Sequence, residues 1–238
     1  MTDPDEQTAP PRSVEDPAPP PEAGQPMPLL DVPAPRLEGR HVRLRPVMPE
    51  DYEALFLLAT RPDVTFRWRT RGNVPSPAAF ADALFRDTLV NFVVEPRGGG
   101  PIIGHMSCGG VQHRDGFAHI AMAARPEFFR TGVILEGAAL LVDYLFDLYP
   151  FRKLYMESID YNFQYLRAGV GTFFEVEAQF REHVWYRDRY WDQYVLAVYR
   201  KAWVQAREQL LPLLTPLETE DEADTPSDQA DGVDATDG

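Results

Sequence analysis

A strand-like segment followed by a glycine turn is the part of this chain whose residues are best suited to bind a ligand. Residues 117–126 read as a strand, and the turn at residues 128–134 leads into a long apolar segment typical of a helix. A strand that runs into a tight turn at the start of a helix directs backbone N–H groups outward at the positive end of the helix dipole. The pattern therefore predicts a site for a phosphate-bearing ligand.

The strand before this turn leaves room for the rest of such a ligand. Ala121, Ala123 and Ala124 have little side-chain bulk, so an extended arm that carries amide groups could lie beside the strand and exchange backbone hydrogen bonds with it. The turn amides would then hold a diphosphate, and an arginine would add positive charge. The residues predicted to contact the ligand are Ala121, Met122, Ala123, Arg130, Thr131, Gly132, Val133 and Ile134. In the competing interpretation, the alanines only pack beneath a helix and Gly132 only shapes a turn.

Apolar periodicity and turn residues predict the elements that would position this site. The expected strands are residues 41–47, 89–95, 101–112, 117–125, 152–158, 180–185 and 192–199, and the expected helices are residues 49–60, 78–86, 134–148, 163–168 and 201–211. Glycine turns at residues 98–100 and 115–116 predict an antiparallel meander of three strands. The fold class is therefore α/β, with a mixed, mostly antiparallel central sheet and flanking helices.

Three local signals refine the helices. Ser76 directly before Pro77 predicts a capped helix start. In the helix at residues 134–148, the leucines at 141, 145 and 148 fall on one apolar stripe, and Ala138 would allow a close approach to the sheet. Pro212 is expected to end the last helix, because proline lacks the N–H group that a helix interior uses.

The negative charge of the chain belongs to its ends. The formal net charge is −14; residues 1–36 contribute −5 and residues 216–238 contribute −9, which leaves the part between them neutral. Eleven of the 23 prolines also lie in residues 1–36. Such segments bury too little apolar surface to offset the entropy of ordering. We therefore expect two disordered acidic tails, residues 1–36 and 212–238, around one domain at residues 37–211.

Composition also excludes several classes of protein. No apolar stretch approaches the length of a membrane span, and the acidic N-terminal segment lacks the features of a secretory signal, so we expect a cytoplasmic protein with no membrane partner. Cys108 is the single cysteine, and no cysteine or histidine set has the spacing of a metal site. The neutral central part argues against general nucleic-acid binding, which depends on neutralising phosphates.

The order of the expected elements carries a resemblance to a known family. Strand, two helices, meander, glycine turn, helix, strand, helix and final hairpin resemble the GNAT superfamily of acetyl-CoA-dependent N-acetyltransferases, most closely its ribosomal-protein N-terminal acetyltransferase-like branch. The likeness covers most of residues 37–203. Residues 37–46 resemble the opening strand of that branch, Gly132 and Glu136 resemble its turn and helix-start positions, and Asn162 heads the segment where the branch has an asparagine-led helix.

The resemblance implies the chemistry of the site. Acetyl-CoA would be the co-substrate, Asn162 would join the residues that hold it, and a primary amine would attack directly in a ternary complex. His119 occupies the strand position where several GNAT enzymes carry a glutamate base, and imidazole titrates near neutral pH. Tyr165 falls at the branch's serine position and would protonate the leaving thiolate, while a backbone N–H near Met122 or Ala123 would polarise the carbonyl. Alternatively, His119 and Tyr165 are an ordinary packed or solvated pair of side chains.

Two other functions remain open at this point. The turn departs from the usual family pattern at Phe129 and Ile134, which is compatible with a non-catalytic acyl-CoA-binding or protein-interaction module. Arg67, Arg69 and Arg71 alternate along one loop and could face an acidic peptide or a nucleic acid, although such arginines are more often only solvated. The acceptor could be a protein N-terminus or a small-molecule amine.

Overall fold

The computed structural model describes residues 34–68, 70–129 and 131–215, and nearly all of them belong to one compact unit that begins at Pro35. Most of the two expected tails lies outside the described residues. The strands are β1 (Val42–Pro46), β2 (Thr88–Pro96), β3 (Gly104–Gln112), β4 (Phe117–Ala124), β5 (Lys153–Ile159), β6 (Glu175–Tyr186) and β7 (Arg189–Tyr199). They form a seven-stranded sheet in the order β1-β2-β3-β4-β5-β7-β6. Neighbours are antiparallel except β4 and β5, which confirms the predicted mixed, mostly antiparallel class.

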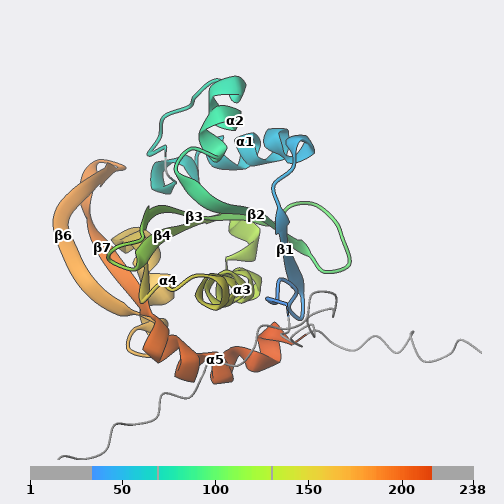
Figure 1. Cartoon of the computed structure of the whole chain (residues 1–238). Coiled ribbons are helices and arrows are strands. Elements are labelled where there is room, and N and C mark those ends of the chain that lie inside the picture. Colours follow the sequence, from blue (N-terminus) through green and yellow to red (C-terminus); the bar gives the residue numbers. More distant parts are fainter. Residues whose placement is uncertain (1–33, 69, 130, 216–238) are drawn as a thin grey trace, which may run out of the picture. The chain divides into compact units, whose positions relative to one another are not determined.

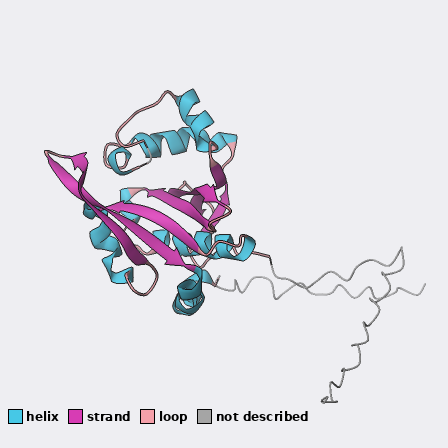
Figure 2. Ribbon diagram, turned by 60° about the vertical axis from the view of Figure 1, so that its left-hand side comes forward, coloured by secondary structure: helices cyan, strands magenta, loops and turns pink. Residues whose placement is uncertain are grey.

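Helices cover both faces of this sheet. They are α1 (Tyr52–Thr60), α2 (Pro77–Leu84), α3 (Val133–Leu148), α4 (Asp160–Leu166) and α5 (Arg200–Leu214), with short 3-10 turns at Pro49–Asp51, Thr65–Arg67, Pro126–Phe128 and Arg167–Gly169. In Figure 1, α1 and α2 lie over one face, and α3 and α5 lie over the other. Figure 2 shows the sheet between these layers, with the β6–β7 hairpin extending beyond them. None of the described helices is long and apolar enough to cross a membrane.

The two helical layers correspond to two apolar cores. On the α1–α2 face, Leu55, Phe80 and Val93 are buried together. On the α3–α5 face, Leu140 and Leu145 belong to a larger buried cluster. Burying a side chain of this size contributes about 1.5–3 kcal/mol relative to leaving it exposed. Alternate residues of β4 face different cores, so the strand is fixed from both sides and can hold its backbone in a defined direction.

Several local predictions are confirmed and others are wrong. The Ser76 side chain caps α2 by accepting a hydrogen bond from the Ala79 backbone N–H at 3.3 Å. Ala138 packs against the larger core as expected, and the neighbouring Gly137 also lies close to the sheet, because an added Cβ there would be 3.0 Å from the Met106 Cε atom. Leu148, expected on the same stripe as buried Leu141 and Leu145, is 48% exposed in the last turn of α3.

The end of α5 also differs from its prediction. The helix continues through Pro212 to Leu214, although proline was expected to stop it. Proline removes a single N–H group near the end of the helix, and buried Leu210 and Leu214 keep the last turns packed. Arg36 Nη1 donates a hydrogen bond to the Leu214 carbonyl at 3.2 Å, which satisfies one terminal acceptor.

The final hairpin is longer than its sequence pattern indicates. β6 begins at Glu175 rather than near Phe180, and its register with β7 shifts between Val176 and Ala178 and again between Phe180 and Val184. Each shift interrupts the alternation of apolar and polar residues by which a strand is recognised. The bulges therefore explain why the first half of β6 was missed.

Candidate active site

The sheet opens between its two parallel strands. Pairing of β4 with β5 consists of Phe117 with Lys153, Ala118 with Leu154 and His119 with Tyr155. Beyond these pairs both strands continue, to Ala124 and Ile159, but separate from each other. A cavity of about 600 Å³ occupies the opening and is lined by both diverging stretches. Its volume lies within the range of small-molecule and cofactor sites.

The register of β3 and β4 determines which backbone groups face this cavity. The Arg125 N–H donates to the Ile103 carbonyl at 2.9 Å, so Arg125 directs its backbone polar groups towards β3. Because these directions alternate along a strand, Ala123 also faces β3, whereas Met122 and Ala124 face the opening. Of the two predicted carbonyl-polarising N–H groups, that of Met122 therefore points to the cavity and that of Ala123 does not.

One end of the cavity reaches the start of α3. Gly132 is the N-cap of this 16-residue helix and has a φ of 85°. As a glycine it has no side chain that could accept a capping hydrogen bond from the first N–H groups of the helix. An added Cβ at Gly132 would meet no atom of the described residues within 4 Å. The first N–H groups of a helix have no partner within the helix, and they attract anions through the helix dipole. The geometry at this turn therefore fits the diphosphate of a nucleotide cofactor.

The acidic residue of this first turn does not oppose an anion there. Glu136 is 1% exposed and accepts hydrogen bonds from the backbone N–H groups of His41 and Val42 at 2.7 and 3.1 Å. The His41 ring lies 2.9 Å from its other carboxylate oxygen. Glu136 thus joins α3 to β1.

The structure brings most of the predicted cofactor residues to the cavity. Those that line it are Ala121, Met122, Ala123, Gly132, Ile134 and Asn162. Val133 instead packs against the larger core, and Thr131 donates its hydroxyl hydrogen bond to the Phe128 carbonyl at 2.9 Å without lining the cavity. Arg130 lies outside the described residues. The predicted strand, turn and helix therefore converge on the cavity, while Val133 and Thr131 are not part of its lining.

Both predicted catalytic side chains also line the cavity. His119 is exposed at the last paired position of β4, and its ring centroid lies 5.4 Å from that of Tyr155. Since Ala121 and Ala123 contact the α1–α2 core, alternation places His119 on that same face. Tyr165 extends from α4 and is 60% exposed. An imidazole and a phenol thus reach one cavity from different elements.

The sequence did not single out a polar cluster on the α1–α2 side of the cavity. Glu157, on the diverging part of β5, accepts a hydrogen bond from Gln193 Nε2 at 2.7 Å. Arg71 Nη2 donates to Glu157 Oε2 at 3.3 Å and to Gln193 Oε1 at 3.2 Å. These residues come from β5, β7 and the segment between α1 and α2, so only the folded chain brings them together. Glu157 shares β5 with Lys153 and Ser158, so its residue type alone did not single it out.

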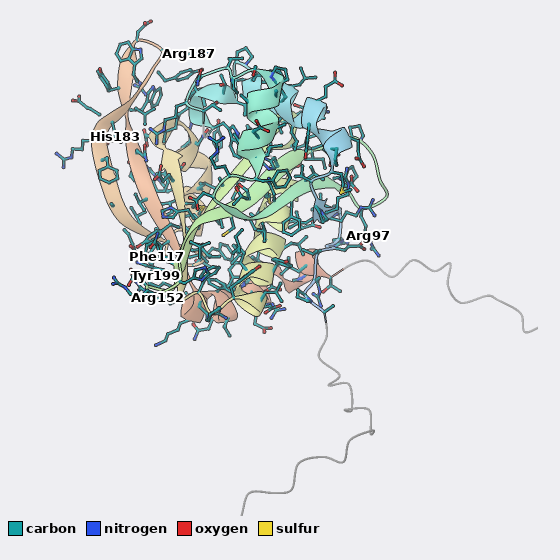
Figure 3. All side chains as sticks on the ribbon, turned by 45° about the horizontal axis from the view of Figure 1, so that its top comes forward. Arg97, Phe117, Arg152, His183, Arg187 and Tyr199 are labelled. Carbon is teal, nitrogen blue, oxygen red and sulfur yellow. The ribbon has the colours of Figure 1, made fainter. Side chains whose placement is uncertain are left out.

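Other chemically active residues lie elsewhere. Cys108 is fully buried, and burial raises the pKa of its thiol to about 12, so it is no nucleophile near neutral pH. Figure 3 shows His183 on the outer side of the β6–β7 hairpin and Arg187 near its tip. Asp192 accepts hydrogen bonds from Gln179 Nε2 at 2.7 Å and the Glu182 N–H at 2.8 Å, and so stabilises that hairpin.

Comparison with known proteins identifies the family. The sequence model of the acetyltransferase (GNAT) domain matches residues 41–168, which is more than half of the chain. This protein belongs to the GNAT acetyltransferase family. No curated protein matches its sequence. The predicted superfamily is therefore confirmed, while the likeness to the ribosomal-protein branch stays a prediction.

Solved structures of GNAT proteins share the fold. A GNAT-family acetyltransferase from Bacillus anthracis is 18% identical, with a TM-score of 0.57, and the match covers 70% of this chain and 99% of that one. A spermidine N-acetyltransferase from Vibrio cholerae, in complex with CoA and spermine, is 18% identical with a TM-score of 0.58, over 68% and 98% of the two chains. A GCN5-related N-acetyltransferase from Brucella melitensis is 23% identical with a TM-score of 0.59, over 77% and 87%. At these identities the likeness concerns the fold.

Proposed function

We propose that this protein is an acetyl-CoA-dependent N-acetyltransferase that transfers an acetyl group to a primary amine by direct attack in a ternary complex. The observation that carries the proposal is the opening between β4 and β5, because one cavity joins the uncapped start of α3 to the strand positions of Met122 and His119. A cofactor with a diphosphate at one end and a thioester at the other fits such a path. Family membership supports the same reaction class.

Each step of the reaction has a candidate group in this chain. Acetyl-CoA supplies an acetyl group activated as a thioester. The first amides of α3 would hold its diphosphate, and the Met122 N–H, which faces the opening, would donate a hydrogen bond to the thioester carbonyl oxygen as negative charge develops there. His119 would accept the proton of the attacking amine, directly or through one water. The Tyr165 hydroxyl would donate a proton to the departing sulfur.

The proposal is tested first by cofactor binding. We would titrate the full-length protein calorimetrically with acetyl-CoA, with CoA and desulfo-CoA for comparison, and then follow acetylation of a panel of primary amines by mass spectrometry. Binding of acetyl-CoA in the micromolar range together with an acetylated product is the expected result. No binding up to millimolar ligand would refute the proposal. Binding without turnover of any amine or peptide would favour the alternative, a non-catalytic module that retains the fold.

A further inference from the structure

The polar cluster at the α1–α2 side of the cavity has the composition of a recognition site for paired charges. Arg71 and Glu157 form an ion pair at 3.3 Å, and their side chains are 53% and 49% exposed. Among the described residues that line the cavity, they are the only ones with a permanent formal charge. The two charges cancel, so this side of the cavity favours neither a polycation nor a polyanion.

Both charged groups retain hydrogen-bonding capacity towards the cavity. Only Nη2 of the Arg71 guanidinium donates to Glu157 and Gln193, and a guanidinium has five N–H donors in total. The Gln193 and Arg71 bonds both end on Glu157 Oε2, and within the described part of the chain no hydrogen bond to Oε1 is recorded. Gln193 is 4% exposed and fixes the orientation of the carboxylate.

The backbone at Arg71 also supports a functional placement. Arg71 has a φ of 46°, in the left-handed region that side chains other than glycine adopt at a cost of about 1–2 kcal/mol. The turn is closed by a hydrogen bond from the Arg71 N–H to the Trp68 carbonyl at 2.9 Å. An arginine held in this conformation, with its side chain directed to β5, is consistent with a strained residue kept for its function.

Apolar side chains surround the charged pair. Val64, Phe66, Trp68 and Val184 line the same cavity as the pair. The Phe66 ring is stacked on Tyr186, with centroids 3.5 Å apart and planes 1° from parallel, so its position is fixed before any ligand binds. A ligand here therefore meets one carboxylate, one guanidinium and a rigid apolar wall.

We infer that the acceptor is a free α-amino acid with an apolar side chain, whose ammonium group binds Glu157 and whose carboxylate binds Arg71. This inference rests on the proposed function. An α-amino acid carries an ammonium and a carboxylate on the same carbon atom. This short separation of opposite charges matches Arg71 and Glu157, whose charged groups are 3.3 Å apart. A monoamine would place its positive charge near the Arg71 guanidinium without a carboxylate to pair with it. A polyamine would bring several positive charges to a site that offers only the Glu157 carboxylate.

The chemistry balances with the groups already assigned. The α-ammonium loses one proton to His119, and the neutral nitrogen forms an amide bond to the acetyl carbon while the carbon–sulfur bond of acetyl-CoA breaks. The sulfur leaves with a proton donated by Tyr165, which regains one from the nitrogen. The products are an N-acetyl amino acid, CoA with a free thiol and one released proton.

The test compares acceptors that differ in one group. With acetyl-CoA and full-length protein, kcat/KM would be measured for L-phenylalanine, for phenethylamine, which lacks the carboxylate, and for spermidine. We expect phenylalanine to be preferred at least 10-fold, since a charge-assisted bidentate contact contributes about 10- to 100-fold in affinity. Arg71→Ala should bring phenylalanine down towards phenethylamine, and Arg71→Gly, which tolerates the left-handed φ, should do the same without disturbing the turn. Glu157→Gln should weaken every amine.

Arg114 provides a matched control, because its ion-pair partner among the described residues is neighbouring Asp115 and its side chain is 92% exposed. Arg114→Ala should leave the preference intact. Preference for spermidine or phenethylamine, or an unchanged preference in Arg71→Ala, would overturn the inference while leaving the acetyltransferase reaction standing. Acetylation of peptide N-termini without acetylation of the free amino acid would also overturn it. Absence of acetyl-CoA binding would instead remove the proposed function on which it rests.

Discussion

Replacing Gly132 by alanine should reveal how much of cofactor binding depends on the glycine turn. Gly132 has a φ of 85°, and an added Cβ would have no atom within 4 Å in the part of the chain that the structure describes. The protein-side penalty is therefore conformational, about 1–2 kcal/mol for a left-handed alanine. If the free protein keeps the native turn, this penalty lowers the free energy of unfolding. If the turn relaxes instead, the α3 amides lose their alignment, and acetyl-CoA must restore it on binding.

The loss in the free energy of unfolding and the loss in the binding free energy are linked, because the bound protein must adopt the strained turn in either case. Their sum should be at least about 1–2 kcal/mol, which corresponds to a factor of about 5–30 in an equilibrium constant. Urea unfolding would measure the first loss, and calorimetry with acetyl-CoA would measure the second. Gly132 lines the cavity, so the added methyl group would also take up space beside the ligand and weaken acetyl-CoA binding further.

A matched control exists in the turn between β2 and β3. Gly99 has a φ of 83°, and an added Cβ there would also meet nothing within 4 Å. Gly99→Ala should lower the free energy of unfolding by a similar amount and leave acetyl-CoA binding unchanged. An unchanged dissociation constant together with an unchanged free energy of unfolding in the Gly132→Ala protein would refute this reasoning.

Three further substitutions test the remaining assignments. His119→Ala should reduce kcat by about 10²- to 10⁴-fold without weakening acetyl-CoA binding, whereas His183→Ala, on the outer hairpin, should not; equal effects would remove the assignment of the base. Tyr165→Phe should slow turnover at saturating substrates by about 10-fold or more, and an unchanged kcat would exclude a proton donor there. Burial raises the pKa of Glu177, but hydrogen bonds led by that from Lys153 outweigh it and hold this pKa at about 2, below the ordinary 4.5. The resulting stability is present above pH 4.5 and is lost as the pH falls towards 2, so Glu177→Gln should cost about 1 kcal/mol at pH 7, after allowance for solvent screening, and less at pH 3 by urea unfolding.

Local signals in the sequence predicted the elements that carry the cofactor site. The Ser76 cap and the glycine turn at Gly132 depend on residues that are neighbours in the chain, so their types alone indicate the structure. The same holds for the meander that ends in β4. These predictions required no knowledge of how the sheet is assembled.

The acceptor side could not be found in this way. Glu157 can reach a ligand in our proposal because β5 separates from β4 after Tyr155. The residue types of the two strands do not predict where their pairing ends. The contacts of Glu157 with Arg71 and Gln193 join positions 86 and 36 residues away along the chain. Likewise, the bulges of β6 and the extension of α5 through Pro212 are set by tertiary packing, which overrides local preference.

The opening itself argues for a ligand that completes the sheet. Met122 and Ala124 direct backbone groups towards β5, yet the pairing between these strands stops at His119. A backbone hydrogen bond contributes about 0.5–1.5 kcal/mol net, and leaving a buried donor without a partner costs more. The two strands are aligned over three residue pairs. Their separation after these pairs costs the stability that further backbone hydrogen bonds between them would add. An extended, amide-bearing arm lying in the opening would supply the hydrogen bonds that β5 does not, and this links the stability given up in the free protein to the binding of acetyl-CoA.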